Sequence, residues 1–370
     1  MRTRLLALVM CASCNLDSSL PGANDDAGND DAANDGASNV DAAASDAAGV
    51  DAADVVDMWI PTATLNPARF AHSSVARNGR LYVFGGQLNG TDVTDLVQMA
   101  TIMPDGRLGS WTATTSLPAA RGGHVSVETN GYVYVLGGCC TTGAQVADVF
   151  YAPINGNGTL GTWTSTTALP SPRQTFAAVA HNGKLYAIAG NYGAGGINRQ
   201  DVQMATVNAN GSLGAWTSLT PLPAPWTAHS SVTATVASSS YLYVIGGGRS
   251  GEQPNGDVLV APINGDGTIG SWTNSTALPN PRATHASVVL NGEILVMGGA
   301  SVNGGNGVVD AIEATVVGSG GVGSWTAMPS LPVGRTYSAS VVANGRIYAL
   351  GGLQANTTPL GDVHVMTPSM

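Results

Sequence analysis

The fold is decided by residues 111–138, which read WTATTSLPAARGGHVSVETNGYVYVLGG. A Trp is followed by Leu-Pro, an Arg, an apolar stretch, Asn-Gly, and a second apolar stretch that ends in Gly-Gly. Asn-Gly between two stretches of β-type residues is a strong local signal for a hairpin. The segment therefore predicts two antiparallel strands on either side of Asn130-Gly131.

The same pattern recurs from Trp59 onward. After each Gly-Gly comes an Asp-Val-type strand, and a Gly-rich turn then leads to the next Trp. The spacings are 52, 52, 53, 56 and 53 residues between Trp59, Trp111, Trp163, Trp216, Trp272 and Trp325. Four short strands in a period of about 50 residues are typical of a β-propeller blade. The sequence predicts an all-β, six-bladed propeller over residues 58–370, with four-stranded antiparallel blades.

The two ends of the repeat array predict how the ring closes. After Gly351-Gly352 the sixth copy has one more strand, Asp362 to Met366, and the array begins with an unmatched strand, Met58-Trp59-Ile60. An open array would leave two exposed sheet edges, which proteins avoid. We therefore expect the N-terminal strand to complete the last blade.

At these residues the chain resembles the kelch-repeat family. The resemblance rests on the spaced Trp residues, the Gly pairs 85–86, 137–138, 246–247, 298–299 and 351–352, and the aromatics Tyr82, Tyr134, Tyr186, Tyr243 and Tyr348. The third copy departs from it with Ala189-Gly190, and the fifth has Leu295 in place of Tyr. Kelch propellers are mostly binding scaffolds and occasionally enzymes, so the resemblance implies the fold more firmly than the function.

The residues before the propeller predict export and a tether. Residues 1–14 have a basic start, a short apolar core and a Cys-Ala-Ser-Cys ending, which resembles the signal of a bacterial lipoprotein with Cys14 as the lipidated residue. Plain secretion is the alternative. Residues 15–57 contain 11 Asp and no Lys or Arg, and composition predicts a disordered spacer there. We expect an exported protein, anchored in a bacterial envelope by lipid or secreted.

Charge excludes several classes of function. The net charge of the chain is −10, but residues 58–370 carry 12 basic and 13 acidic side chains, so the acidity belongs to the spacer. Basic clusters and long apolar runs are missing, which argues against nucleic-acid binding and against a membrane span. A monomer that touches a membrane only through its lipid is expected.

Topology sorts the loops between two faces of the ring. Tight Asn-Gly and Asp-Gly turns fall on one face, and the longer loops after each Gly-Gly fall on the other, where we expect function. Arginines recur at the start of the inner strand on this second face, and the fourth copy has Trp instead. These predicted ligand-binding residues are Arg69, Arg121, Arg173, Trp226, Arg282 and Arg335. Arg would bind acidic groups and Trp would stack on a sugar; the alternatives are bonding to backbone carbonyls and simple packing.

Three further groups of side chains are candidates for a metal site, a disulfide or additional ligand contacts. His72, His124, His229 and His285 share one repeat position with Phe176 and Ser338, which favours a packing slot over a metal site, so no metal and no cofactor are expected. Adjacent thiols in an oxidising compartment predict a disulfide between Cys139 and Cys140, with a loop stiffener or free thiols as alternatives. Arg199, Arg249 and Glu252 on the long loops are possible further contacts.

The sequence thus predicts a non-catalytic propeller that binds a glycan, an acidic ligand or a protein partner on the long-loop face. One alternative is a sugar-processing enzyme, because exported bacterial kelch propellers include a sialic acid epimerase; Arg199, Arg249 and Glu252 would then be the candidate residues. The other alternative is a structural surface protein.

Overall fold

The computed structural model describes residues 57–139, 143–193, 196–249, 254–301, 312–318, 320–355 and 358–369. In this part of the chain every regular element is a β-strand, as the composition predicts. It contains no helix with the length and apolarity needed to cross a bilayer. The predicted leader, the spacer up to residue 56, and with them Cys14 lie outside the described residues.

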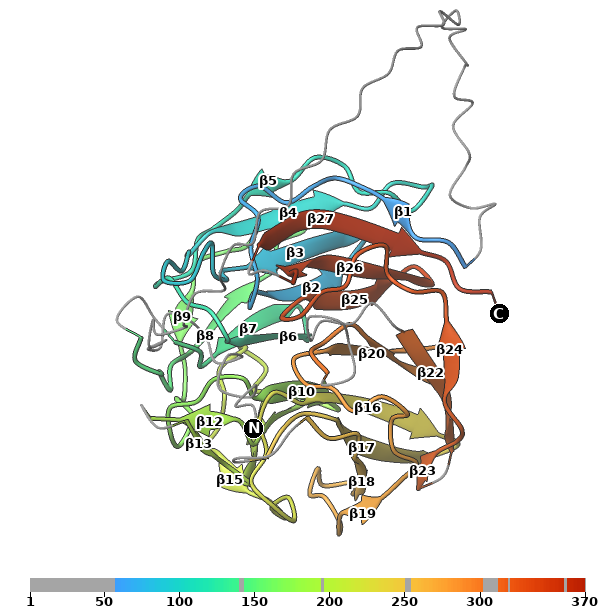
Figure 1. Ribbon diagram of the computed structural model, residues 1–370. Helices are drawn as coiled ribbons and strands as arrows, with labels where there is room; N and C mark the ends of the chain where they lie inside the picture. The colour runs from blue at the N-terminus through green and yellow to red at the C-terminus, as the bar shows by residue number, and fades with distance from the viewer. Residues whose placement is uncertain are drawn as a thin grey trace, which may run out of the picture.

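The strands form sheets arranged around a common centre (Figure 1). Repeat one comprises β2 (Ser73–Arg77), β3 (Arg80–Phe84), β4 (Val97–Thr101) and β5 (Thr112–Ala113). Repeat two comprises β6 (Val125–Thr129), β7 (Tyr132–Leu136), β8 (Val149–Pro153) and β9 (Thr164–Ser165). Repeat three comprises β10 (Ala177–His181), β11 (Lys184–Ile188), β14 (Val202–Thr206) and β15 (Thr217–Ser218).

The remaining sheets follow the same order from the centre outward. Repeat four comprises β16 (Ser230–Val236), β17 (Ser239–Ile245), β18 (Val258–Ile263) and β19 (Thr273–Asn274). Repeat five comprises β20 (Ala286–Leu290), β21 (Glu293–Met297), β22 (Ile312–Gly318), β23 (Gly321–Val322) and β24 (Thr326–Met328). The last sheet comprises β25 (Ala339–Ala343), β26 (Arg346–Leu353), β27 (Pro359–Met366) and β1 (Ile60–Pro61).

Five of these sheets have four strands, as predicted, and the sheet of the fifth repeat has five. There both β23 and β24 pair with β22. The turn that joins β22 to β23 is also shorter than its counterparts. Val317 pairs with Val322 across it, whereas Ile263 pairs with Ile269 in the preceding repeat, so one residue fewer separates the paired positions.

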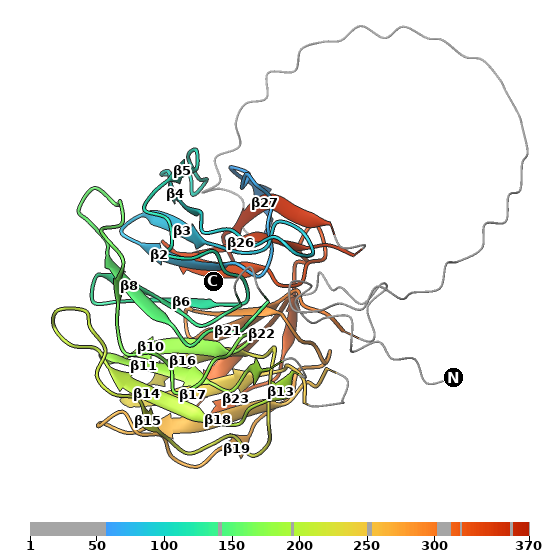
Figure 2. The same cartoon turned by 90° about the vertical axis from the view of Figure 1, so that its left-hand side faces the viewer.

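The ring closes as the sequence predicts. Ile60 of β1 pairs with Val365 of β27, so the N-terminal strand supplies the outer strand of the last sheet. The innermost strands contact one another in the cyclic order β2, β6, β10, β16, β20, β25 and back to β2. In both views the red β26 lies near the blue β2 and β3 (Figures 1 and 2). The observed strands differ from the predicted ones by a few residues: β1 begins at Ile60 and β27 at Pro359.

Adjacent sheets pack face to face through apolar layers. Leu81 and Val83 of the first repeat, for example, pack against Tyr348 and Leu350 of the last. These side chains alternate along their strands, so one side of each strand contacts one neighbouring sheet. The core is therefore a series of layers between blades, with the strand ends left to form the two faces of the ring.

The repeated Gly-Gly pairs lock neighbouring sheets together. The second Gly of each pair donates its N–H to the carbonyl of the Arg position in the next sheet, and Gly352 to Arg69 completes the circle at 3.0 Å. At Gly352 φ is +107°, and a Cβ there would lie 2.9 Å from the carbonyl oxygen of Thr336. The backbone conformation and the close approach both require glycine.

Two sets of repeated aromatic residues, Trp and Tyr, form hydrogen bonds between neighbouring sheets. Each of the six repeated Trp residues donates its indole N–H to a carbonyl near the preceding sheet, from Trp59 to Pro329 through Trp325 to Thr276. Four of the repeated Tyr hydroxyls donate to a Gly carbonyl in the outer turn of the next sheet: Tyr82 to Gly158, Tyr134 to Gly211, Tyr186 to Gly267 and Tyr348 to Gly106. The repeated sequence thus encodes contacts between blades.

Candidate binding face

The loop face is defined here as the side of the ring that carries the segments after each Gly-Gly, and the turn face as the side of the Asn-Gly turns. At Asn78-Gly79, φ is +48° and +69°, which is the conformation of a tight hairpin turn. The loop face is more varied and includes a small additional sheet, β12 (Asn191–Tyr192) with β13 (Ile197–Asn198).

The five repeated arginines lie on the loop face but are almost completely buried. Each is at most 1% exposed. Each donates Nη1 to the carbonyl of the first residue of its own Gly-Gly or Ala-Gly pair: Arg69 to Gly85, Arg121 to Gly137, Arg173 to Ala189, Arg282 to Gly298 and Arg335 to Gly351, at 2.9–3.3 Å. This geometry agrees with the alternative of bonding to backbone carbonyls. A role in ligand binding stays a prediction.

Burial and nearby acceptors define the electrostatics of these arginines. Burial lowers the pKa of Arg69 to about 10, which still leaves its guanidinium charged at neutral pH. Arg69 also contacts the side-chain oxygen of Gln98. Arg173 and Arg335 each pair with a carboxylate at 2.7 Å, Asp201 and Asp362 respectively. The charges of Arg173 and Arg335 are thus paired within their own blades.

Trp226 takes over the Arg contact in the fourth repeat. Its indole N–H donates to the carbonyl of Gly246 at 2.6 Å, the position that Arg Nη1 contacts elsewhere. The ring is fully buried in an apolar cluster that includes Tyr186 and Leu222, and the guanidinium carbon of Arg249 lies 4.5 Å from its centroid. A sugar could therefore not stack on Trp226 without rearrangement of these neighbours.

Arg249 supplies the cation that the fourth repeat lacks. Its Nη2 pairs with Asp257 at 2.6 Å, and its side chain is 34% exposed. Trp226 and Arg249 together thus replace one buried arginine: the indole N–H contacts the carbonyl, and Arg249 contacts the carboxylate. The substitution moves a guanidinium from the interior to the loop face.

Arg199 is the second partly exposed arginine of the loop face. Its Nε donates to Asp201 at 2.6 Å, and its guanidinium carbon lies 5.2 Å from the ring centroid of Tyr192. Burial acts to raise the pKa of Asp201, but the charge of Arg173 and hydrogen bonds from both arginines outweigh it, and the pKa is lowered. Asp201 is therefore ionised at neutral pH and orients both guanidinium groups.

The other predicted loop residues are only partly described. Glu252 and Cys140 lie outside the described residues, so the structure does not bear on the predicted disulfide. Cys139 is buried, and its backbone exchanges two hydrogen bonds with Gly122 of the segment leading into the same blade.

A closed ring of backbone hydrogen bonds surrounds the axis, and the sequence reasoning did not anticipate it. It is made by the residue two positions after each Arg or Trp: Ala71, Gly123, Thr175, Ala228, Thr284 and Tyr337. Each N–H donates to the carbonyl of the residue in the preceding blade, at 2.8–3.2 Å. All six have φ between +47° and +62°. The residue type at this position varies from repeat to repeat, so the sequence gives no recurring signal for these hydrogen bonds.

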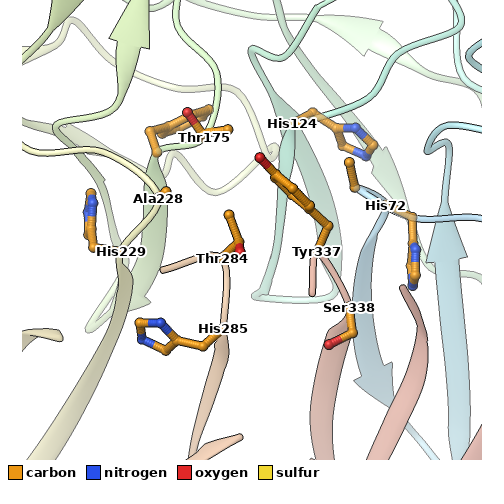
Figure 3. Close-up of a pocket in the computed structure, with 12 residues that line it drawn as sticks. His72, His124, Thr175, Ala228, His229, Thr284, His285, Tyr337 and Ser338 are labelled. Carbon is orange, nitrogen blue, oxygen red and sulfur yellow. The ribbon is translucent and has the colours of Figure 1, made fainter. Parts of the chain in front are cut away.

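A cavity of about 140 Å³ lies at this ring, lined by the ring residues and by the position that follows each of them (Figure 3). The imidazoles of His72, His124, His229 and His285 lie around the outside of the ring and do not converge (Figure 3). Burial lowers the pKa of each to about 3, so all four are neutral at pH 7. Among the described residues no group of His, Cys, Asp or Glu is arranged to hold a metal ion.

The histidines occupy the predicted packing slot. A Cβ on Gly85 would lie 3.0 Å from His124 Cε1, and a Cβ on Gly137 would lie at the same distance from Phe176 Cε1. Histidine and phenylalanine thus make the same contact with the Gly pair of the preceding blade. Five of the six copies thus fill the slot with a flat ring, whereas the last copy has Ser338 there. His285 also uses its imidazole in a hydrogen bond between Nε2 and Ser230 Oγ, at 2.8 Å.

Strand order, ring closure and these contacts define the protein as a β-propeller, and comparisons with known proteins agree. The sequence profile of the KLHDC2/KLHL20/DRC7 Kelch-repeats domain matches residues 55–219. An F-box/kelch-repeat protein of Arabidopsis thaliana is 32% identical over 157 residues, which are 40% of this chain and 38% of that protein. Beta-scruin of Limulus polyphemus is 27% identical over 65% of this chain and 26% of its own length.

Two further comparisons extend over most of the chain. Kelch-like protein 35 of Mus musculus is 24% identical over 74% of this chain and 41% of that protein. The solved structure of YjhT superimposes with a TM-score of 0.66 and 16% identity, over 82% of this chain and 95% of that one. The family profile and the kelch relatives support a kelch-repeat β-propeller family for this chain. It spans less than half the length of these curated relatives, and the solved structure supports the fold alone.

Proposed function

We propose that this protein is a non-catalytic interaction propeller whose partner binds the loop face. The kelch-repeat relatives indicate a protein-interaction propeller in general terms. We also infer that the propeller has six blades, of which five are the four-stranded sheets and one is the five-stranded sheet.

One observation carries the proposal: the described side chains that recur in the repeat are used in holding the ring. The repeated Trp, Arg and most Tyr residues contact backbone carbonyls, and the repeated His residues fill slots between blades. What remains for a partner are residues that depart from the repeat, and those on the loop face include the β12–β13 hairpin, Arg199 and Arg249. Binding residues commonly lie on variable loops held by a rigid scaffold.

The finer expectations remain proposals based on the sequence. An acidic ligand suits the partly exposed Arg199 and Arg249. A glycan ligand loses its expected stacking platform, since Trp226 is fully buried in an apolar cluster. Export and lipid anchoring are proposed from the sequence of residues 1–57, and the protein is proposed to be a monomer. Labelled fatty acid should be incorporated by the full chain but not by the Cys14→Ser variant.

A pair of matched variants tests the choice of face. Asn89→Arg changes an exposed loop tip of the first blade, and Asn157→Arg changes an exposed turn on the opposite face. In both cases the side-chain oxygen accepts a hydrogen bond from the backbone N–H two residues further on. The full chain is tested on peptide and glycan arrays. We expect Asn89→Arg to alter binding and Asn157→Arg to leave it unchanged. The reverse result would contradict the proposal, as would turnover of a sialic or uronic acid by the protein.

A further inference from the structure

We propose that the loop face between the third and fourth repeats binds a protein segment in which an acidic residue adjoins apolar ones, and this inference rests on the proposed interaction function. The patch consists of four partly or largely exposed side chains, Tyr192, Ile197, Arg199 and Arg249. It is called the blade 3–4 patch below.

The first observation is the exposed apolar surface of the additional hairpin. Among the described residues, large apolar side chains that are more than a third exposed are Met58, Met103, Tyr192 and Ile197. Two of these four lie directly opposite each other on β12 and β13, where Tyr192 pairs with Ile197. Ile197 is 55% exposed. Apolar side chains gathered on an element outside the repeat mark an interaction surface, because they add nothing to the core.

The second observation is that this hairpin is held in place. Asn191 exchanges two backbone hydrogen bonds with Gln174, which leads into the same blade. Gly193 donates its N–H to the side-chain oxygen of Gln145 in the loop of the second repeat, at 3.0 Å. The hairpin is thus fixed both to its own blade and to its neighbour, so a partner would not have to order it on binding.

The third observation is that two guanidinium groups lie beside the hairpin in fixed orientations. Arg199 stacks on Tyr192, and Arg249 stacks on Trp226. The backbones of the two stacks are in contact, because the backbone N–H of Trp226 donates to the carbonyl of Arg199 at 2.6 Å. The two pairs of ring and cation therefore lie on neighbouring segments at the boundary between two blades.

These cations keep unused hydrogen-bonding capacity. A guanidinium has five N–H donors. Within the described residues Arg199 uses Nε on Asp201, and Arg249 uses Nη2 on Asp257. Since Asp201 also pairs with the buried Arg173, three guanidinium groups face two carboxylates, and these five groups carry a net charge of +1.

The chemistry of the patch selects its partner. The free N–H groups fit a carboxylate, which Arg binds with defined geometry, and the exposed Tyr192 and Ile197 fit an apolar side chain beside it. Tyr and Arg are frequent at the energetic centres of protein interfaces. A ligand with charge alone would leave the two apolar side chains exposed, and an apolar ligand would leave the cations without a partner.

The test uses an array of decapeptides in which Asp or Glu adjoins Leu, Ile, Phe or Tyr, probed with the full chain. Two control peptides are included: the same sequences with Asn or Gln as the acid, and a copy of residues 24–33, NDDAGNDDAA, which is acidic without large apolar residues. Affinities of the best peptides are then measured by fluorescence anisotropy. The expected result is binding of acidic–apolar peptides at least tenfold tighter than either control.

Variants locate the binding. Arg199→Gln with Arg249→Gln should lower the affinity at least 30-fold and Ile197→Asn at least threefold, with thermal midpoints within 2 °C of the wild type. Lys184→Gln removes a cation from the turn face of the third blade, where it contacts Thr206, and should change nothing. Equal binding of residues 24–33 would reduce the patch to a charge effect and overturn the inference, as would selective binding of uronic-acid oligosaccharides.

The two proposals can fail separately. If a bound peptide is insensitive to the double Arg variant but is lost in Asn89→Arg, the loop-face function stands and the blade 3–4 patch is wrong. If its binding is lost only in turn-face variants, both are wrong.

Discussion

Replacing Tyr348 by Phe removes a hydroxyl that ties the last blade to the first. The hydroxyl donates to the carbonyl of Gly106 at 2.8 Å, across 242 residues of sequence, and the side chain is fully buried. Burial raises the pKa of Tyr348 to about 12, so the group remains a donor at ordinary pH. Phe keeps the ring and its packing, and the change therefore isolates the hydrogen bond.

The expected loss is about 1–2 kcal/mol. A neutral buried hydrogen bond contributes about 1 kcal/mol net, and the Gly106 carbonyl left without its partner adds a part of its desolvation cost. In a domain of this size that loss lowers the thermal midpoint by about 2–4 °C. Urea unfolding at pH 7, with an unchanged slope against urea, measures it directly.

The chain contains a matched control for this prediction. Tyr243 occupies the same position in the fourth repeat and is equally buried, but within the described residues its hydroxyl has no partner. The turn that it would reach is the short one between β22 and β23. Tyr243→Phe should be neutral or slightly stabilising. If it costs as much as Tyr348→Phe, ring packing and not the hydroxyl bond stabilises these positions, and the reasoning is refuted.

Three further predictions concern the ring. His124→Phe should make stability less sensitive to acid. The pKa of His124 is about 3 in the folded protein against an ordinary 6.5, so the unfolded chain takes up the proton first. The free energy of unfolding therefore falls as the pH drops from 6.5 toward 3, by up to about 1.4 kcal/mol per pH unit for each imidazole. Phe already fills this slot at position 176, and urea unfolding at pH 7, 6 and 5 checks the slope; an unchanged slope contradicts it. Arg335→Met should cost about 3 kcal/mol in the same assay, because it strands a carboxylate and a carbonyl; a neutral result would free this arginine for ligand binding. Gly352→Ala should lower the free energy of unfolding by about 3 kcal/mol. Gly345→Ala should lower it by about 1 kcal/mol, because φ there is +72° but a Cβ meets nothing within 4 Å. Equal losses would contradict the argument from close approach at Gly352.

Periodicity was enough to predict the fold because each repeat carries its own turn and strand signals. Asn-Gly specifies the hairpins, Gly-Gly specifies the close approach between blades, and the unmatched strand at Trp59 predicts closure through β1 and β27. The five-stranded sheet escaped prediction. The pairing of both β23 and β24 with β22 depends on a turn one residue shorter, which local sequence signals do not distinguish from its neighbours.

The candidate site was harder to predict because burial is a tertiary property. A recurring Arg on the loop face fits both a ligand site and an internal bond, and the 0% exposure of Arg335 follows from the blades that cover it. Trp226 was rightly identified as a departure from the repeat, yet its burial in an apolar cluster and its stack with Arg249, 23 positions further along, are features of the folded chain. The hairpin at Tyr192 has a readable signal, a Gly-rich turn flanked by Tyr and Ile, but its exposure could not be read from the sequence.

Hydrogen–deuterium exchange of the full chain, with and without its best-binding acidic–apolar peptide, tests the central claim most directly: ring-holding residues recur, and binding uses the residues that depart from them. The account predicts new protection in fragments covering Asn191–Asp201 and Trp226–Arg249 on the loop face, with no change at the turns Asn78-Gly79 and Asn182-Gly183. Protection confined to those turns, or spread evenly over the inner strands, would contradict it.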